Sequence, residues 1–87
     1  MQSTTLIINN PTGLHARPAT LFTQTAAKFK SKITLQKGDK AVDAKSILKV
    51  LTLAIKQGQD VTLTAEGEDE AQAIAALTEL VTANFGE

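Results

Sequence analysis

The chain has 87 residues with one histidine and no cysteine, and nine basic and nine acidic residues give a formal net charge of zero. This length suits a single domain, residues 1–87, while the absence of thiols and the lone histidine exclude disulfide bridges and argue against a metal site. No apolar run is long enough for a membrane helix or a signal peptide, and no basic cluster carries interleaved aromatics, so we expect a cytoplasmic protein that binds neither membrane nor nucleic acid.

The first half of the chain predicts a strand, a helix and a hairpin. Residues 3–9 are rich in β-formers and end at a breaker cluster, Asn-Asn-Pro at 9–11. A helix is expected to begin near Ala16, with Pro18 in its first turn, where a missing N–H costs least. Its apolar residues recur at helical spacing: Ala19, Phe22, Ala26 and Phe29, with Leu21 to one side. Residues 32–36 alternate, and KGDK at 37–40 predicts a turn into a return strand at 41–42.

The second half predicts a short helix, a strand and a last helix. Ser46 can cap a helix running to about Leu53, and Gly58 is expected to supply the left-handed residue beyond its end. Residues 60–66 alternate and predict a strand, which Gly67 interrupts. The last helix is expected to start at Glu68 or Asp69. Its apolar side carries Ile74, Leu77 and Val81, and Phe85 and Gly86 close the domain.

The resulting order, β-α-β-β-α-β-α, predicts a two-layer α+β fold with the helices on one face of a mainly antiparallel sheet. All nine basic residues lie between Arg17 and Lys56, and seven of the nine acids lie from Asp60 onward. If the fold keeps these halves on different faces, the basic face would attract acidic partners. Otherwise the charges are simply solvated.

His15 and Arg17 are the residues best placed for chemistry. His15 lies in a turn directly before a helix, where the free amide groups of Ala16 and Arg17 and the positive end of the helix dipole favour an anion. Neutral imidazole is a nucleophile near neutral pH, and the Arg17 guanidinium can bind phosphate oxygens. Together they could form and hold a phosphorylated imidazole. The alternative is that His15 is a helix cap or an ordinary surface residue.

The segment around this histidine resembles a known signature. GLHARPA at residues 13–19 is similar to the active-centre motif of the HPr family, the histidine-containing phosphocarriers of the bacterial phosphoenolpyruvate:sugar phosphotransferase system. KSILK at 45–49, the Gln-Gly pair at 57–58 and GEDEA at 67–71 also resemble that family at the expected distances. The resemblance therefore covers nearly the whole chain.

The resemblance implies both a fold and a function. The fold would be an open-faced β-sandwich, a four-stranded antiparallel sheet covered on one face by three helices. Phosphorylated enzyme I would transfer its phosphoryl group to Nδ1 of His15, and the protein would pass it to an enzyme IIA domain, with Arg17 stabilising the phosphate. Such a protein is a stoichiometric carrier and not an enzyme, it needs no cofactor or metal, and it is expected to be a monomer.

The resemblance also implies a docking surface near the histidine. Its apolar part would be formed by Ile47, Leu48 and Leu51, with Thr20 beside them and Arg17, Lys45 and Lys49 as a positive rim. The alternative is that the apolar residues belong to the core, as we expect for Val50 and Leu53.

Ser46 has two interpretations. One is the helix cap. The other is regulatory phosphorylation, as in one branch of the family, which would repel acidic partners. That branch usually has glycine where this chain has Lys49, so we favour the cap.

Three other functions stay open at this point. The carrier could serve a nitrogen-related regulatory branch of the phosphotransferase system instead of sugar uptake, and phosphorylation by the two types of enzyme I would separate them. A small phosphatase would also use an arginine at a helix start, but it needs a group that orients water. In a purely regulatory binding module, His15 would be incidental.

Overall fold

The computed structural model describes residues 1–86, so Glu87, the last residue of the expected domain, lies outside it. The predicted order of elements is confirmed. The elements are β1 (Gln2–Ile7), α1 (Ala16–Ala27), β2 (Lys32–Lys37), β3 (Lys40–Asp43), α2 (Ile47–Thr52), β4 (Asp60–Glu66) and α3 (Glu70–Thr82), followed by a 3₁₀ turn at Asn84–Gly86.

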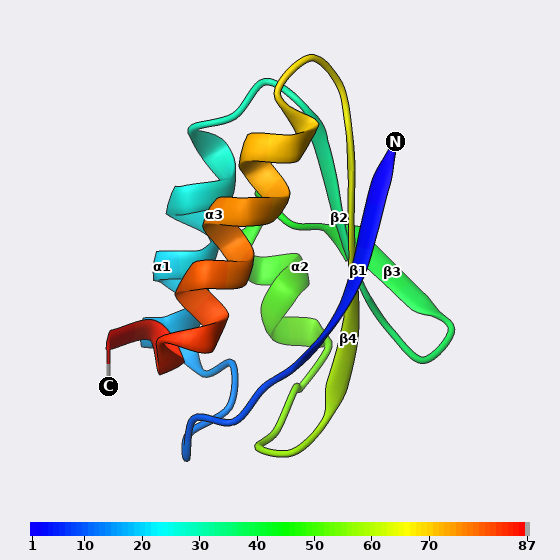
Figure 1. Ribbon diagram of the computed structural model, residues 1–87. Coiled ribbons are helices and arrows are strands. Elements are labelled where there is room, and N and C mark those ends of the chain that lie inside the picture. The colour runs from blue at the N-terminus through cyan, green and yellow to red at the C-terminus, as the bar shows by residue number, and fades with distance from the viewer. Residues whose placement is uncertain (87) are drawn as a thin grey trace.

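The four strands form one antiparallel sheet in the order β1-β4-β2-β3. β4 is the last strand in sequence but lies between β1 and β2. All three helices cover the same face of this sheet (Figure 1). The predicted α+β architecture, a four-stranded antiparallel sheet under three helices, is therefore confirmed.

Alternation along the strands decides which side chains enter the core. Val61, Leu63 and Ala65 of β4 are buried against the helices, as predicted. Their neighbours face the open side of the sheet, where Thr64 pairs with Ser3 of β1 and Thr34 of β2. This open face is polar because no second layer covers it.

The helices bury the stripes that the sequence predicted. α1 buries Ala19, Phe22 and Ala26, and α3 buries Leu77 and Val81. Two side chains with apolar spacing lie less deep: Phe29, beyond the end of α1, and Ile74 are half-buried against the core. Phe85 is buried in the final turn with φ 57°.

The prediction that Gly58 supplies the left-handed residue at the end of the second helix is wrong. α2 ends at Thr52, and the left-handed residue is Ala54, with φ 50°. Gly58 has φ 87°, but it serves the turn before β4, where its amide donates to the Ile8 carbonyl at 2.7 Å. The helix ends within one residue of the predicted Leu53, and only the place of the left-handed residue differs.

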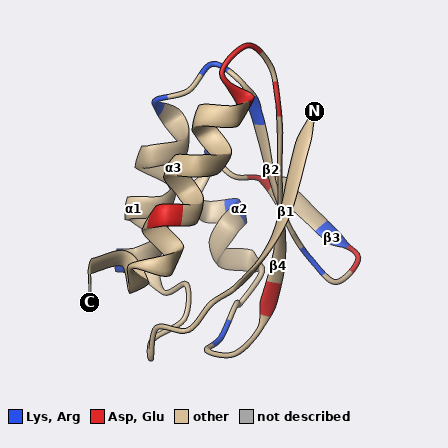
Figure 2. Ribbon diagram, viewed as in Figure 1, with Lys and Arg blue, Asp and Glu red and all other residues tan. Residues whose placement is uncertain are grey.

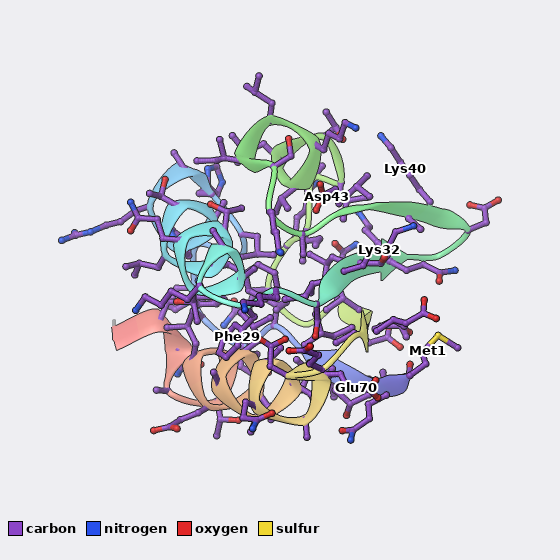
Figure 3. All side chains as sticks on the ribbon, turned by 90° about the horizontal axis from the view of Figure 1, so that it is seen from above. Met1, Phe29, Lys32, Lys40, Asp43 and Glu70 are labelled. Carbon is purple, nitrogen blue, oxygen red and sulfur yellow. The ribbon has the colours of Figure 1, made fainter. Side chains whose placement is uncertain are left out.

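The N-terminus is fixed to the last helix. The ammonium group of Met1 lies 2.9 Å from the Glu70 carboxylate, at the start of α3 (Figure 3). That carboxylate also accepts the Gly67 amide at 3.3 Å. The Met1 ammonium group, followed by the Gly67 amide, lowers the pKa of Glu70.

Basic and acidic residues are not kept on separate faces (Figure 2). Lys32 of β2 pairs directly with Glu66 of β4. The acidic turn before α3 lies beside the loop after α1, because Asp69 accepts the Lys30 amide at 2.8 Å. The uneven distribution along the sequence therefore does not produce a wholly basic face.

Candidate functional site

His15 occupies the N-cap position of α1, with φ −76° and ψ −175°. Its carbonyl accepts the Ala19 amide at 2.8 Å, which starts the helix. Its side chain makes no capping hydrogen bond, and the residue is exposed. The imidazole of this N-cap histidine is therefore not used to cap the helix, and its chemical role stays a prediction.

The backbone before His15 lies against the segment that follows α2. The Leu14 amide donates to the Ile55 carbonyl at 3.0 Å, and the Leu14 side chain is buried. Gly13 has φ 62°, and a Cβ added there would lie 2.5 Å from the Ile55 oxygen and 2.9 Å from Lys56 Cα. Only glycine allows this approach. The approach and the Leu14 hydrogen bond together fix the direction in which the chain enters α1.

Asn10 holds the same loop from inside. It is fully buried, and its Nδ2 donates to the Gly13 carbonyl at 2.7 Å and to Thr12 Oγ1 at 3.2 Å. The backbone carbonyl of Asn10 accepts the Gly13 amide at 3.0 Å. Sequence reasoning treated Asn10 only as part of a strand-breaking cluster. The feature that could have predicted this role is the general tendency of asparagine side chains to hydrogen-bond to nearby backbone groups.

A shallow hollow of about 290 Å³ lies beside the histidine. Its walls are apolar apart from the imidazole and a lysine: Leu14, His15, Leu51, Ala54, Ile55 and Lys56. Residues 14–15 and 51–56 are far apart in sequence, so the hollow forms only when α1 packs against the end of α2. It is open to a partner and too small to enclose a substrate.

Arg17 is exposed on the first turn of α1. It lines a second hollow of about 410 Å³ together with Pro18, Thr20, Leu21, Phe85 and Gly86. The amides of Ala16 and Arg17 belong to the first turn, where no carbonyl lies four residues earlier within the helix. Arg17 and His15 line different hollows, and the site for a dianion formed by the Arg17 charge and the first-turn amides stays a prediction.

Comparison with known proteins decides the family. Residues 2–83 match the family described as "PTS HPr component phosphorylation site". The chain belongs to the HPr family. It is 46% identical over 80 residues to the phosphocarrier protein HPr of Neisseria meningitidis, covering 92% of this chain and 90% of that protein. The resemblance suggested by GLHARPA is therefore confirmed, and the chain is an HPr-type phosphocarrier of the phosphotransferase system.

Solved HPr structures share this fold. HPr-C-His from Thermoanaerobacter tengcongensis is 53% identical, with a TM-score of 0.98 over 100% of this chain and 98% of that one. A structure described as an HPr dimer from the same organism is also 53% identical and covered in full, but its TM-score is 0.81. The open-faced sandwich of the HPr family is thus confirmed. None of the helices within residues 1–86 is long and apolar enough to cross a membrane.

The residues predicted to dock partners lie on and around α2, but they differ in exposure. Leu48 is 75% exposed, whereas Ile47 and Leu51 are half-buried and pack partly against the core. Leu51 also lines the hollow at His15. Thr20 is half-buried, and its hydroxyl donates to the Ala16 carbonyl at 2.7 Å. Leu48 is therefore the apolar side chain most open to a partner.

The two lysines of the predicted rim also differ. Lys49 is exposed on α2. Lys45 precedes that helix, and its Nζ donates to the Phe29 carbonyl at 2.7 Å, beyond the end of α1. Because Leu51 lies beside His15 while Lys45 lies beside Phe29, α1 and α2 run antiparallel. The Lys45 charge is thus directed to the end of α1 that is far from the histidine.

Ser46 is the N-cap of α2, as predicted, and its Oγ accepts the Lys49 amide at 3.4 Å. It is half-buried, and its carbonyl accepts the Val50 amide at 3.0 Å. The capping role is therefore confirmed. Phosphorylation of Ser46 stays a prediction.

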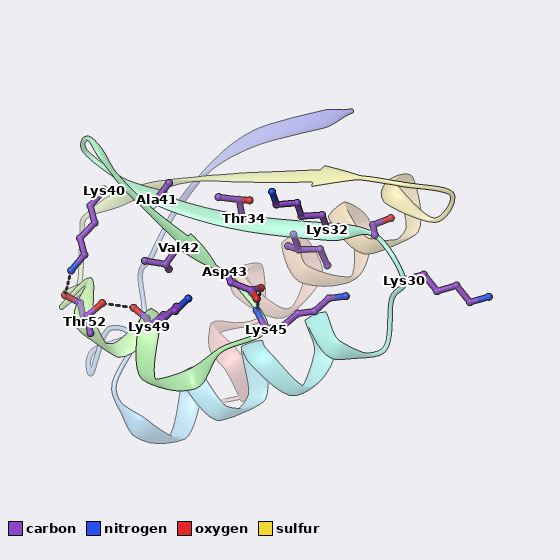
Figure 4. A pocket seen from close by; sticks show the side chains of 12 residues that line it. Lys30, Lys32, Thr34, Lys40, Ala41, Val42, Asp43, Lys45, Lys49 and Thr52 are labelled. Carbon is purple, nitrogen blue, oxygen red and sulfur yellow. Dashed lines mark hydrogen bonds between the residues drawn. The ribbon is translucent and has the colours of Figure 1, made fainter.

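A wider groove of about 760 Å³ lies elsewhere, between α2 and the β2–β3 hairpin (Figure 4). Asp43 is its one acidic side chain. Five lysines line it: Lys30, Lys32, Lys40, Lys45 and Lys49. None of the residues that surround His15 belongs to it. Its lysines differ in role, because Lys45 and Lys40 bond to backbone carbonyls.

Proposed function

We propose that His15 accepts a phosphoryl group from phosphorylated enzyme I and transfers it to an enzyme IIA domain. Membership of the HPr family supports a phosphocarrier. The observation that carries the proposal for His15 is its place at the N-cap of a 12-residue helix with an exposed, uncapped imidazole. Phosphoryl transfer needs mainly positioning and charge stabilisation, which this arrangement supplies.

The transfer consists of two successive displacements at phosphorus. The lone pair on Nδ1 of neutral His15 attacks phosphorus, a P–N bond forms, and the bond from phosphorus to the donor breaks with its electron pair left on the donor. The amides of Ala16 and Arg17 and the Arg17 guanidinium bind the phosphoryl oxygens. In the second step the nucleophile of enzyme IIA attacks the same phosphorus, and the P–N bond to His15 breaks.

One surface serves both partners in turn. Leu48 and Leu51 lie on α2, and the α2 end of that surface meets the hollow at His15. Ile47 and Thr20 border it, and Arg17 and Lys49 add exposed positive charge, which speeds encounter with acidic partners. Every described group at the site comes from one chain, so a monomeric carrier suffices. The absence of cysteine suits the reducing cytoplasm.

The test is phosphorylation in a defined mixture. The protein is incubated with enzyme I, phosphoenolpyruvate and magnesium, and its intact mass is followed for wild type and His15→Ala. We expect one added phosphoryl group in wild type, labile in acid and stable in base, and none in the variant. Addition to His15→Ala would show that another residue is the acceptor.

The same mixture separates the two branches of the phosphotransferase system. We expect faster labelling by the sugar-type enzyme I than by the nitrogen-related type. The reverse order would assign the carrier to regulation. Labelling by neither enzyme, with both shown to be active, would contradict the carrier function.

A further inference from the structure

The chain that leaves α2 has an unusual set of hydrogen-bond partners. The carbonyls of Val50 and Leu51 accept the amides of Leu53 and Ala54, each at 3.1 Å. The next three carbonyls accept lysine side chains instead. Thr52 receives Lys40 Nζ at 3.4 Å (Figure 4). Leu53 and Ala54 both receive Lys37 Nζ, at 2.9 and 3.2 Å.

Lys37 reaches these carbonyls because of its register in β2. It follows Ile33 and Leu35 on the core-facing side of the strand, at the point where the sheet ends. The side chain is half-buried, and its ammonium group meets the end of α2. A cation at the C-terminus of a helix complements the dipole and satisfies carbonyls that the helix leaves free.

The residue that Lys37 holds is strained. Ala54 has φ 50°, a conformation that a residue with a Cβ rarely adopts. The next carbonyl, that of Ile55, accepts the amide of Leu14, the residue before His15. The following residue, Lys56, touches Gly13. A direct path of contacts therefore runs from Lys37 through Ala54 and Ile55 to the loop that carries the imidazole.

We propose that Lys37 is a positioning residue for His15: its ammonium group holds the 53–54 carbonyls, keeps Ala54 left-handed, and so fixes the Ile55 carbonyl on which the His15 loop rests. The proposal rests on the function proposed for His15, and it concerns a residue that lies outside the motif and the docking surface. Lys37 does not touch the phosphoryl group.

Three variants separate this role from general stability. Lys37→Met keeps the length of the stem and removes the ammonium group. Lys37→Arg keeps a cationic donor. Lys40→Met is the matched control, because Lys40 also bonds to the end of α2 but stops at Thr52, before the strained residue. Circular dichroism and thermal unfolding test whether each variant is folded. Lys37→Gln replaces Lys37→Met if the latter does not fold.

Two readouts are measured: hydrogen exchange of the Leu14 amide by NMR, and the kinetics of phosphorylation by enzyme I. We expect Lys37→Met to speed exchange of that amide and to lower the maximal rate by on the order of tenfold, with the apparent KM within about twofold of wild type. Lys37→Arg should restore both, and Lys40→Met should match wild type in both.

Unchanged Leu14 exchange in folded Lys37→Met would overturn the proposal, and so would an equal effect of Lys40→Met. If wild type takes up no phosphoryl group, the proposed function fails. The Leu14 exchange data then still decide whether Lys37 positions the loop.

Discussion

The Asp69 carboxylate accepts a 2.9 Å hydrogen bond from the Ser31 amide, across 38 residues of sequence. It also accepts the Ser31 hydroxyl and, at 2.8 Å, the Lys30 amide. Asp69 stands at the N-cap position of α3, yet its side chain makes no capping bond there. The acid at the start of this helix is thus a tertiary clamp that joins the loop after α1 to α3.

Replacing Asp69 with asparagine should destabilise the protein, because both carboxylate oxygens accept hydrogen bonds from residues 30–31 and asparagine keeps only one of these acceptors, uncharged. We expect a lower urea midpoint at neutral pH for Asp69→Asn than for wild type. Glu68→Gln is the control, since it removes an exposed charge one residue earlier in the same turn. Equal midpoints for the two variants would show that the clamp contributes nothing beyond local charge.

The same clamp predicts acid sensitivity. The Ser31 hydroxyl, followed by the Lys30 amide, lowers the pKa of Asp69 from 3.8 to about 2. Its contribution to folding stability is therefore complete above pH 3.8 and is lost as the pH falls toward 2. Glu70, whose pKa is also lowered, acts in the same direction. Urea unfolding across this range should show a shallower pH dependence for Asp69→Asn than for wild type, and parallel curves would contradict the assignment.

Gly13→Ala should destabilise the His15 loop more than its backbone angle alone explains. Gly13 and Gly38 both have φ 62°, but a Cβ meets the Ile55 oxygen at 2.5 Å only at Gly13 and meets nothing within 4 Å at Gly38. We expect Gly38→Ala to cost about 1 kcal/mol and Gly13→Ala at least about 2 kcal/mol. Chemical denaturation measures both, and an equal loss would mean that the loop yields to the added methyl.

Leu48→Ser should weaken docking without affecting the fold. Leu48 is 75% exposed, so we expect the free energy of unfolding of the variant to differ from that of wild type by no more than about 0.5 kcal/mol. We expect the KM of enzyme I for the variant to be about tenfold higher than for wild type. Ile7→Thr is the matched control, because Ile7 is 55% exposed on the open face of the sheet. A similar rise in KM for both variants would place docking elsewhere.

Periodicity predicted most of the fold because local rules decide it. Alternation at Val61, Leu63 and Ala65 and helical spacing at Ala19, Phe22 and Ala26 each report which side of one element is apolar. The place of His15 before a helix was also a local feature, given by the Gly13 and Pro18 that flank it. These predictions needed no knowledge of what lies on the other side of the core.

What the sequence did not reveal depends on contacts between distant segments. Lys37 was read as a turn residue, and its bonds to residues 53 and 54 become visible only once the hairpin lies beside α2. The left-handed residue was sought at Gly58 because glycine favours that conformation, whereas Ala54 adopts it with its carbonyl bonded to Lys37. Asp69 suited a helix cap by type, but its partners come from the loop after α1.

The place of β4 between β1 and β2 has a consequence for synthesis of the protein. A growing chain that has not reached residue 66 holds β1 without its full partner strand, and the β2–β3 hairpin has no neighbour on its inner edge. The loop of His15 rests on the Ile55 carbonyl, and the Ile55 side chain is buried in the core that lies between the helices and this sheet. We therefore expect a nascent chain to present the histidine motif long before the site is assembled, so that under the proposed function only the nearly finished protein accepts a phosphoryl group.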